Sequence, residues 1–209
     1  MDKFEKYQEM LIETNKKFNL TSIEDPEEIR IKHFEDSLTI ESYINKGMKV
    51  LDIGSGAGFP GIPLRIKKDF DLTLIDSVNK KVKFMNEVIE ELDLENTRAI
   101  HTRAEDFAKD HREEFDLVIS RAVANLSTLS EYALPFLKVG GIFIAMKGPK
   151  AEDEYKDAQN ALKTLGGELI NIDNINLHGN TRKNILIKKI RSTKKKYPRG
   201  KNQAKKNPL

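Results

Sequence analysis

One stretch, residues 50–63, limits the possible fold of this chain more than any other. Its sequence, VLDIGSGAGFPGIP, places an apolar run before four glycines and a second apolar run after them. Glycine permits positive φ and lets a ligand approach the backbone closely. A helix that begins just beyond such a turn presents unpaired N–H groups. The pattern predicts a buried strand, a tight turn and a helix, with a small ligand at the turn.

Two acidic residues are expected beside this turn. Asp52 ends the first strand, and Asp76 ends the next one, 20 residues after Gly56. An acid at that interval binds the ribose hydroxyls in nucleotide-binding α/β units. Asp52 would place negative charge by the turn, which suits a cationic ligand and disfavours a pyrophosphate. Pro60 also lacks the N–H that a pyrophosphate would use.

Two classes of cofactor fit this arrangement. Residues 56–61 match the G-x-G-x-x-G pattern of nicotinamide oxidoreductases, although Gly54 already follows the strand two residues earlier. S-adenosylmethionine (SAM) carries an ammonium and a sulfonium but no phosphate, so the charge argument favours it. Gly54, Gly56 and Gly58 would then surround this cofactor beside Asp52. The segment 104–106 lies where its adenine would reach.

Strands alternate with helices after residue 47, which predicts an α/β fold with a mostly parallel sheet. The last two strands have only a loop between them and should form an antiparallel hairpin. Strands are expected at 50–53, 72–76, 97–101, 115–120, 142–146, 168–175 and 185–190. Helices are expected at 3–18, from 25 to before 47, after 61, and at 77–92, 126–137 and 152–165. We expect a helical cap (1–46), a ligand-binding domain (47–190) and a tail (191–209).

The tail contains eight basic residues and no acid, whereas residues 1–190 carry a net charge of −5. It is almost free of apolar side chains, so composition predicts a flexible segment. Its cations are candidates for binding RNA phosphates, although a solvated terminus that only aids solubility stays open. The candidates are Lys194, Lys195, Lys196 and Arg199 in the tail and Arg182 before it.

Several classes of site are not expected in this chain. It has no cysteine, which excludes disulfides and thiolate chemistry. The four histidines lack metal-ligand spacing, so no metal is expected. No stretch is apolar enough for a signal peptide or a membrane span. We therefore expect a cytoplasmic, monomeric protein that does not bind membranes.

Further polar residues are candidates for positioning a substrate. His33 and Asp36 share one helix face, where they could line the pocket or simply pair with each other. Arg121 follows the fourth strand and could bind the ligand, or pair with Asp52 or Glu105. Lys147, after the fifth strand, could contact a phosphate or solvent. Asn125 is a weaker candidate.

Seven motifs occur together in a characteristic order and spacing: NLTS (19–22), HFEDSL (33–38), LDIGSGAGFPGIPL (51–64), LIDSVNKKVKF (74–84), TRAEDF (102–107), ISRAVANL (119–126) and MKG (146–148). Over nearly its whole length the chain resembles the small-subunit (16S) ribosomal RNA guanine-N7 methyltransferases, the glucose-inhibited division protein B family. The resemblance implies a class I SAM-dependent methyltransferase (Rossmann-like) fold. It also implies SAM contacts at Gly54, Phe59, Ala104, Glu105 and Arg121.

The resemblance implies methyl transfer to N7 of one guanine, in free small-subunit RNA or in the 30S particle. Guanine N7 is a neutral lone pair, so its attack requires positioning more than a general base. In A-form RNA it lies in a deep, narrow groove, so the target should be unpaired or distorted. The alternatives are a methyltransferase-fold enzyme on another substrate, an NAD-type oxidoreductase, or an RNA-binding assembly factor without catalytic activity.

Overall fold

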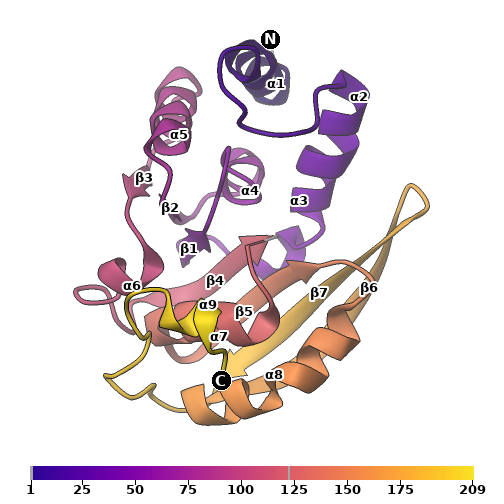
Figure 1. Ribbon diagram of the computed structural model, residues 1–209. Helices are drawn as coiled ribbons and strands as arrows, with labels where there is room; N and C mark the ends of the chain where they lie inside the picture. Colours follow the sequence, from indigo (N-terminus) through magenta and orange to yellow (C-terminus); the bar gives the residue numbers. More distant parts are fainter. Residues whose placement is uncertain (1, 122) are drawn as a thin grey trace.

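The computed structural model describes residues 2–121 and 123–209. Seven strands form one sheet with helices on both faces (Figure 1). The strands are β1 (Lys49–Ile53), β2 (Asp71–Asp76), β3 (Thr97–His101), β4 (Phe115–Arg121), β5 (Leu137–Lys147), β6 (Gly167–Leu177) and β7 (Asn180–Lys189). The helices are α1 (Lys3–Asn15), α2 (Pro26–Ile29), η1 (Arg30–Glu35), α3 (Asp36–Leu38), η2 (Glu41–Tyr43), α4 (Gly61–Lys67), α5 (Asn79–Glu91), α6 (Ala104–Phe107), α7 (Leu126–Ala133), η3 (Leu134–Phe136), α8 (Ala151–Leu165) and α9 (Gln203–Lys206).

The strand order is β3-β2-β1-β4-β5-β7-β6. The first five strands pair in parallel, and β7 pairs antiparallel with both β5 and β6. The predicted parallel sheet with a closing hairpin is therefore confirmed. Strand β1 lies between β2 and β4, so the strand order reverses there. Open α/β sheets bind ligands beyond the carboxyl ends of the strands at such a point.

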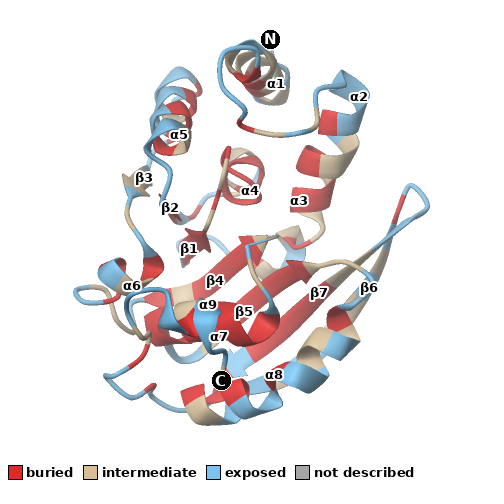
Figure 2. Cartoon of the chain, viewed as in Figure 1, coloured by how far each residue is buried: buried red, intermediate tan, exposed pale blue. Residues whose placement is uncertain are grey.

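Alternate residues of each central strand enter two separate hydrophobic cores. Val50 joins the core under α1, α4 and α5, whereas its neighbour Leu51 joins the core under α7 and α8. The central strands are buried on both faces, as Figure 2 shows. This burial explains why their sequences are almost continuously apolar.

The N-terminal helices share the first core rather than forming one of their own. Tyr7 of α1 packs against Phe34, Phe59 and Phe84, at ring-centroid distances of 5.4, 5.3 and 6.3 Å. The expected second helix does begin at Pro26, where the Asp25 side chain accepts a hydrogen bond from the N–H of Glu28 (2.9 Å). The segment expected as a cap is thus part of the folded body.

Several element boundaries differ from the expected ones; among them, β7 begins at Asn180 instead of residue 185, and α7 ends at Ala133 instead of residue 137. Helix α1 ends at Asn15, because this side chain accepts hydrogen bonds from the N–H groups of Leu20 and Thr21 (2.8 and 3.0 Å) and begins a turn. The second helical segment contains a π-helical stretch, η1, and ends at Leu38. Strand β5 begins at Leu137, so Gly140 and Gly141 lie within the strand instead of preceding it.

The basic tail differs most from its expected state. Composition predicts a flexible segment, yet Thr193, Tyr197 and Ala204 are buried. The Arg112 guanidinium donates hydrogen bonds to the carbonyl oxygens of Tyr197 (2.6 Å) and Thr193 (2.9 Å). The tail therefore packs on the body through backbone groups and a few side chains, which its average composition does not reveal.

Candidate functional site

The glycine turn lies against the carboxyl end of β2. The N–H groups of Gly54 and Ser55 donate to the carbonyl of Ile75 (2.8 and 3.3 Å). The N–H of Gly56 donates to Asp76 Oδ2 (2.9 Å). Both Gly54 and Gly56 have positive φ (69° and 61°), which explains why glycine is needed there.

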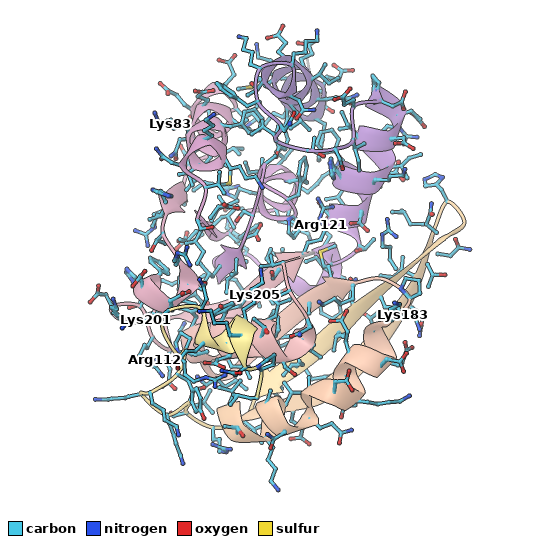
Figure 3. All side chains as sticks on the ribbon, viewed as in Figure 1. Lys83, Arg112, Arg121, Lys183, Lys201 and Lys205 are labelled. Atoms are coloured by element: carbon cyan, nitrogen blue, oxygen red, sulfur yellow. The ribbon has the colours of Figure 1, made fainter. Side chains whose placement is uncertain are left out.

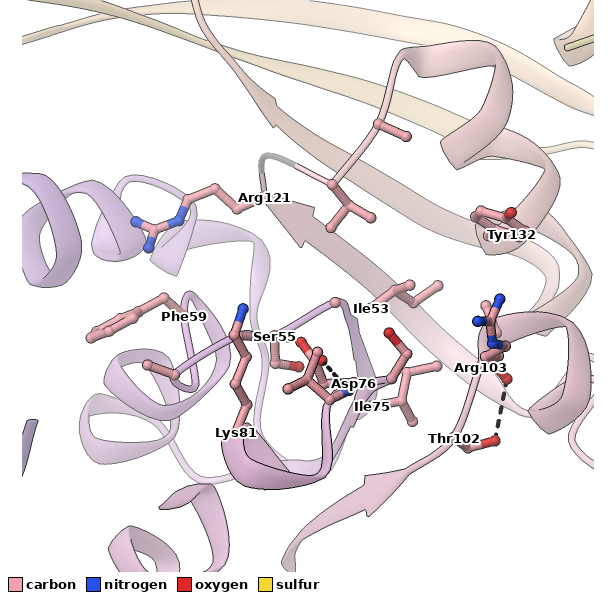
Figure 4. A pocket seen from close by; sticks show the side chains of 18 of the residues that line it. Ile53, Ser55, Phe59, Ile75, Asp76, Lys81, Thr102, Arg103, Arg121 and Tyr132 are labelled. Carbon is pink, nitrogen blue, oxygen red and sulfur yellow. Dashed lines mark hydrogen bonds between the residues drawn. The ribbon is translucent and has the colours of Figure 1, made fainter. Parts of the chain in front are cut away.

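A cavity of about 500 Å³ opens above this turn. Its walls come from the glycine turn, the ends of β2 and β4, the segment 102–105 and Leu20–Thr21 of the N-terminal region. In Figure 4, Phe59 and Arg121 lie at one end of the cavity, and Arg103 and Tyr132 lie at the other. The structure thus places a pocket at the edge of the sheet that the sequence indicates.

Most of the predicted cofactor contacts line this cavity, the first pocket. The lining includes Gly54, Gly56, Phe59, Asp76, Ala104, Glu105 and Arg121. Asp52 and Gly58 are not among the described residues that line this pocket. These two residues were expected to contact the ligand, and the structure gives them a different environment.

Asp52 lies beneath the glycine turn and is fully buried. Its Oδ2 accepts a hydrogen bond from the N–H of Gly61 (2.9 Å), whereas Oδ1 has no partner among the described residues. Burial raises the pKa of this carboxyl to about 8. Burial therefore disfavours the negative charge that was expected beside the ligand.

Gly58 is required for packing rather than for ligand access. A Cβ on Gly58 would lie 2.5 Å from Ile62 Cδ1 and 2.7 Å from the Tyr7 hydroxyl. That hydroxyl donates a hydrogen bond to the carbonyl of Ala57. The close approach of α1 therefore leaves no room for a side chain at this position.

Asp76 has the geometry expected of a ribose-binding acid. Its two oxygens accept hydrogen bonds from the N–H groups of Gly56 (2.9 Å) and Val78 (2.8 Å). A carboxylate has about four lone-pair directions, so two remain for a ligand. The backbone thus holds this side chain in a fixed orientation at the pocket wall.

Arg121 joins β4 to the N-terminal helical segment. Its Nη1 donates to Asp36 Oδ2 (2.9 Å) and to the carbonyl of Lys32 (3.1 Å), and its Nη2 donates to His33 Nδ1 (3.0 Å). The guanidinium also lies 5.2 Å from the ring centroid of Phe59. The alternative pairing of Arg121 with Asp52 or Glu105 is wrong, because Asp36 is its carboxylate partner.

His33 is neutral in this arrangement. It stacks on Phe59 with 4.5 Å between ring centroids, and its Nε2 lies 2.8 Å from Thr21 Oγ1. Burial, together with the Arg121 charge, lowers the pKa of His33 to about 4. Since Nδ1 accepts from Arg121, Nε2 carries the proton. The hypothesis of a direct pair between His33 and Asp36 is wrong, because Arg121 lies between them.

A second cavity, of about 590 Å³, adjoins the first. The two share His33, Arg121, Val123 and Ala124 in their linings. The charged side chains that line the second cavity are Lys32, Arg121, Lys147 and Arg182, with Asp36 and Glu154. Cations therefore outnumber carboxylates, which favours a substrate that carries phosphate groups.

The remaining polar candidates divide into two groups. Lys147 and Arg182 line the second cavity, where Lys147 pairs with Glu154 (2.8 Å) and Arg182 pairs with Asp36 (2.9 Å). Lys147 is almost buried, so it is not a solvated loop residue. Asn125 instead caps helix α7 by accepting the N–H of Thr128 (2.9 Å).

The cations of the tail also form two groups, exposed lysines and an arginine that is paired with a buried carboxylate. Lys194, Lys195 and Lys196 are exposed, as expected for phosphate-binding residues. Arg199 is bound to the buried carboxylate of Glu131 (2.6 Å), so it is an anchor for the tail rather than a free cation. Lys205 belongs to α9, and Lys201 precedes this helix; Figure 3 labels both side chains.

Four pocket residues that the fold brings in from both ends of the chain were not expected from the sequence. Leu20, Thr21, Asn202 and Lys205 line the first pocket. The NLTS motif at 19–22 is a signal that could have indicated the first two. Composition offered no such signal for the tail residues, because they resemble a solvated terminus.

The described ranges, 2–121 and 123–209, contain no cluster of three or more side chains suited to hold a metal ion. They also contain no helix with the length and hydrophobicity that crossing a bilayer requires.

A solved structure of similar fold is a SAM dependent methyltransferase from Aquifex aeolicus. Its TM-score is 0.60 at 18% identity, and the match covers 86% of this chain and 98% of that one. This likeness shows a shared fold, so the methyltransferase fold expected from the sequence is confirmed.

Sequence comparisons are more specific. A protein from Desulforamulus reducens named ribosomal RNA small subunit methyltransferase G is 51% identical over 203 residues, covering 94% of this chain and 85% of that protein. A Clostridium botulinum protein of the same name is 46% identical over 215 residues, covering 100% of this chain and 90% of that protein. The family model for GidB, described as rRNA small subunit methyltransferase G, matches residues 1–185. On these matches, the chain belongs to the GidB family.

Proposed function

We propose that this protein transfers a methyl group from SAM to N7 of a guanine in small-subunit ribosomal RNA. The observation that carries the proposal is the junction of the two cavities at His33 and Arg121, beyond the carboxyl end of β4. A cofactor in the first cavity and a base in the second would meet at this junction. Family membership supports the same substrate class.

The first cavity fits SAM by the chemistry of its walls. Asp76 retains acceptor capacity for ribose hydroxyls, and Ala104 and Glu105 form the adjoining wall. Pro60 removes a backbone donor where a pyrophosphate would bind. When bound, SAM supplies the methyl group on an electrophilic sulfonium. Gly56 leaves the backbone accessible to it, because no heavy atom of the described residues lies within 4 Å of its Cβ position.

The second cavity fits a nucleotide within an RNA chain. Lys147 and Arg182 provide positive charge toward flanking phosphates, in partial competition with their carboxylate partners. Guanine N7 needs no deprotonation, which agrees with a neutral His33 that bonds to Arg121 and Thr21. These residues are therefore expected to orient the base and exclude water rather than to move a proton.

Arg121 is the residue that we expect to matter most for positioning. It contacts the cap segment and the Phe59 ring, and it belongs to both cavity walls. Its guanidinium makes three directed hydrogen bonds, which a lysine ammonium cannot reproduce in the same fork geometry. Arg121→Lys should therefore retain the charge and lose the orientation.

The test is incorporation of labelled methyl from SAM into 30S particles and into naked small-subunit RNA, with the modified guanine mapped by cleavage. We expect Arg121→Lys to lower the rate about 10- to 100-fold, the range associated with a misplacement of about 1 Å. Lys83→Met, an exposed change on α5, is the control and should behave as the unchanged protein. Circular dichroism checks that each variant folds.

Other outcomes would contradict the proposal. SAM binding without methyl transfer to either substrate would favour an assembly factor. Binding of NADH without binding of SAM would indicate an oxidoreductase. Methyl transfer to a nucleotide atom other than guanine N7 would support methyltransferase activity but contradict the proposed acceptor atom.

A further inference from the structure

The C-terminal segment 199–209 contributes to a cavity whose other walls come from distant parts of the chain. Asn202 and Lys205 both line the first pocket. Asn202 Oδ1 accepts a hydrogen bond from Arg103 Nη1 (2.8 Å). Arg103 also lines this pocket, directly before Ala104 and Glu105. The segment therefore meets the wall proposed to hold the adenosine part of the cofactor.

An ion pair holds the segment in this place. Glu131 of α7 is buried, with 1% of its side chain exposed. Its carboxylate accepts hydrogen bonds from the backbone N–H (2.7 Å), Nε (2.9 Å) and Nη2 (2.6 Å) of Arg199. Several directed bonds between one buried carboxylate and one arginine define a single position for the chain.

Helix α7 connects this anchor to the pocket. Thr128 lines the pocket and donates a hydrogen bond from Oγ1 to the carbonyl of the buried Ala204 (3.1 Å). Tyr132, which follows Glu131, lines the pocket as well. Helix α7 thus contributes side chains to the cavity and also holds the C-terminal segment.

A basic arm for RNA alone would not require these contacts. The guanidinium of Arg199 is used in an intramolecular pair, whereas Lys194–Lys196 are exposed. The amide of Asn202 and the ammonium of Lys205 instead lie at the cavity, where adenine ring nitrogens could accept hydrogen bonds from them.

We propose that residues 199–209 are part of the cofactor site, as its outer wall on the adenosine side, and that the Arg199–Glu131 pair keeps this wall in position. The proposal rests on the proposed function, since it takes SAM as the occupant of the pocket. Asn202 and Lys205 are its binding residues, and Arg199 is a positioning residue.

The experiment measures affinity for S-adenosylhomocysteine by calorimetry, without RNA. A chain truncated after Pro198, which also carries Glu131→Gln so that no buried carboxylate loses its partner, is compared with the unaltered full-length chain. We expect truncation to weaken binding about tenfold, because the wall and its hydrogen bonds are removed. Asn202→Ala with Lys205→Ala in the full chain should weaken binding severalfold, whereas Lys195→Ala, which removes the same charge, should not.

Limited trypsin digestion provides a second measurement, the relative rates of cleavage at different lysines. A general gain in stability would slow cleavage at all of them alike. Bound S-adenosylhomocysteine should slow cleavage at Lys201 and Lys205 more than at Lys83. Equal affinity in the truncated chain and the unaltered full-length chain would overturn the tail's role while leaving the proposed function intact. Failure of the unaltered chain to bind S-adenosylhomocysteine would overturn both.

Discussion

Asp52 is a carboxyl group in an apolar environment, held by one hydrogen bond from Gly61. Its pKa of about 8 is set mainly by burial, with weaker opposing effects from hydrogen bonds and Arg121. Because the unfolded chain ionises this group near pH 4, the unfolded state binds fewer protons than the folded state between about pH 4 and pH 8. Asp52 therefore makes the fold less stable as the pH rises through this interval.

Asp52→Asn should remove this pH-dependent cost while keeping an oxygen to accept the Gly61 N–H. Relative to the unaltered protein, the variant should gain stability from pH 4 to pH 8, by up to about 1.4 kcal/mol for each pH unit, and no further above pH 8. Urea unfolding at a series of pH values measures the difference. A difference that stays constant with pH would show that the carboxyl ionises normally in the fold.

Arg121 and His33 form one hydrogen-bonded unit at the junction of the two cavities. Arg121 donates to the ring nitrogen of His33 and to Asp36, and this contact lowers the histidine pKa in addition to burial. A neutral imidazole stacked on Phe59 gives the junction of the two cavities a fixed, uncharged surface. The neutral His33 imidazole contributes to the stability of the fold above pH 6.5, and this contribution is lost as the pH falls toward 4.

At the scale of elements, the turn between β1 and α4 combines two different demands for glycine. Gly56 faces the pocket, and no heavy atom of the described residues lies within 4 Å of the Cβ position there. Gly58 faces α1 and α4, where a Cβ would collide with Tyr7 of α1 and Ile62 of α4. One turn therefore serves the ligand with one glycine and helix packing with another.

Substitution by alanine should separate these demands. Gly58→Ala should lower the melting temperature strongly, with a loss of about 2–4 kcal/mol from overpacking and a strained φ of 103°. Gly56→Ala should cost about 1 kcal/mol of stability and mainly weaken cofactor affinity. Differential scanning calorimetry and S-adenosylhomocysteine titration measure the two effects. Equal melting temperatures for the variants would contradict this division.

For the whole molecule, segments from both ends of the chain meet around the cofactor pocket. Leu20 and Thr21 belong to one side, and Asn202 and Lys205 belong to the other. The exposed cations Lys194–Lys196 remain outside this contact region and stay available for RNA. The tail thus has two parts, one for the proposed RNA and one for the proposed cofactor.

Replacing Lys194, Lys195 and Lys196 together by alanine should affect RNA only. We expect weaker binding and a salt dependence reduced by up to about three in the slope of log affinity against log salt, about one for each lost phosphate contact. Filter binding of small-subunit RNA at several salt concentrations measures this slope. An unchanged slope would show that these lysines do not contact phosphates, and S-adenosylhomocysteine affinity without RNA should stay constant.

Much of the architecture could be predicted because its signals are local. Apolar runs ending at glycine or at an acid predicted β1 and β2, and the alternation of elements predicted the parallel sheet. Asp25 predicted the start of α2 by capping. Backbone preferences and the alternation of buried residues depend on neighbours in the sequence, so a single chain contains this information.

Local sequence patterns therefore predict the sheet, the glycine turn and most, but not all, of the expected cofactor contacts that line the first pocket. Only the tertiary structure decided which charges meet: Arg121 with Asp36, 85 residues apart, and Arg199 with Glu131, 68 residues apart. It also decided that Asp52 is buried, which raises its pKa, and that Asn202 and Lys205 of the tail line the first pocket. These features depend on distance and desolvation in the folded chain, which no local pattern specifies.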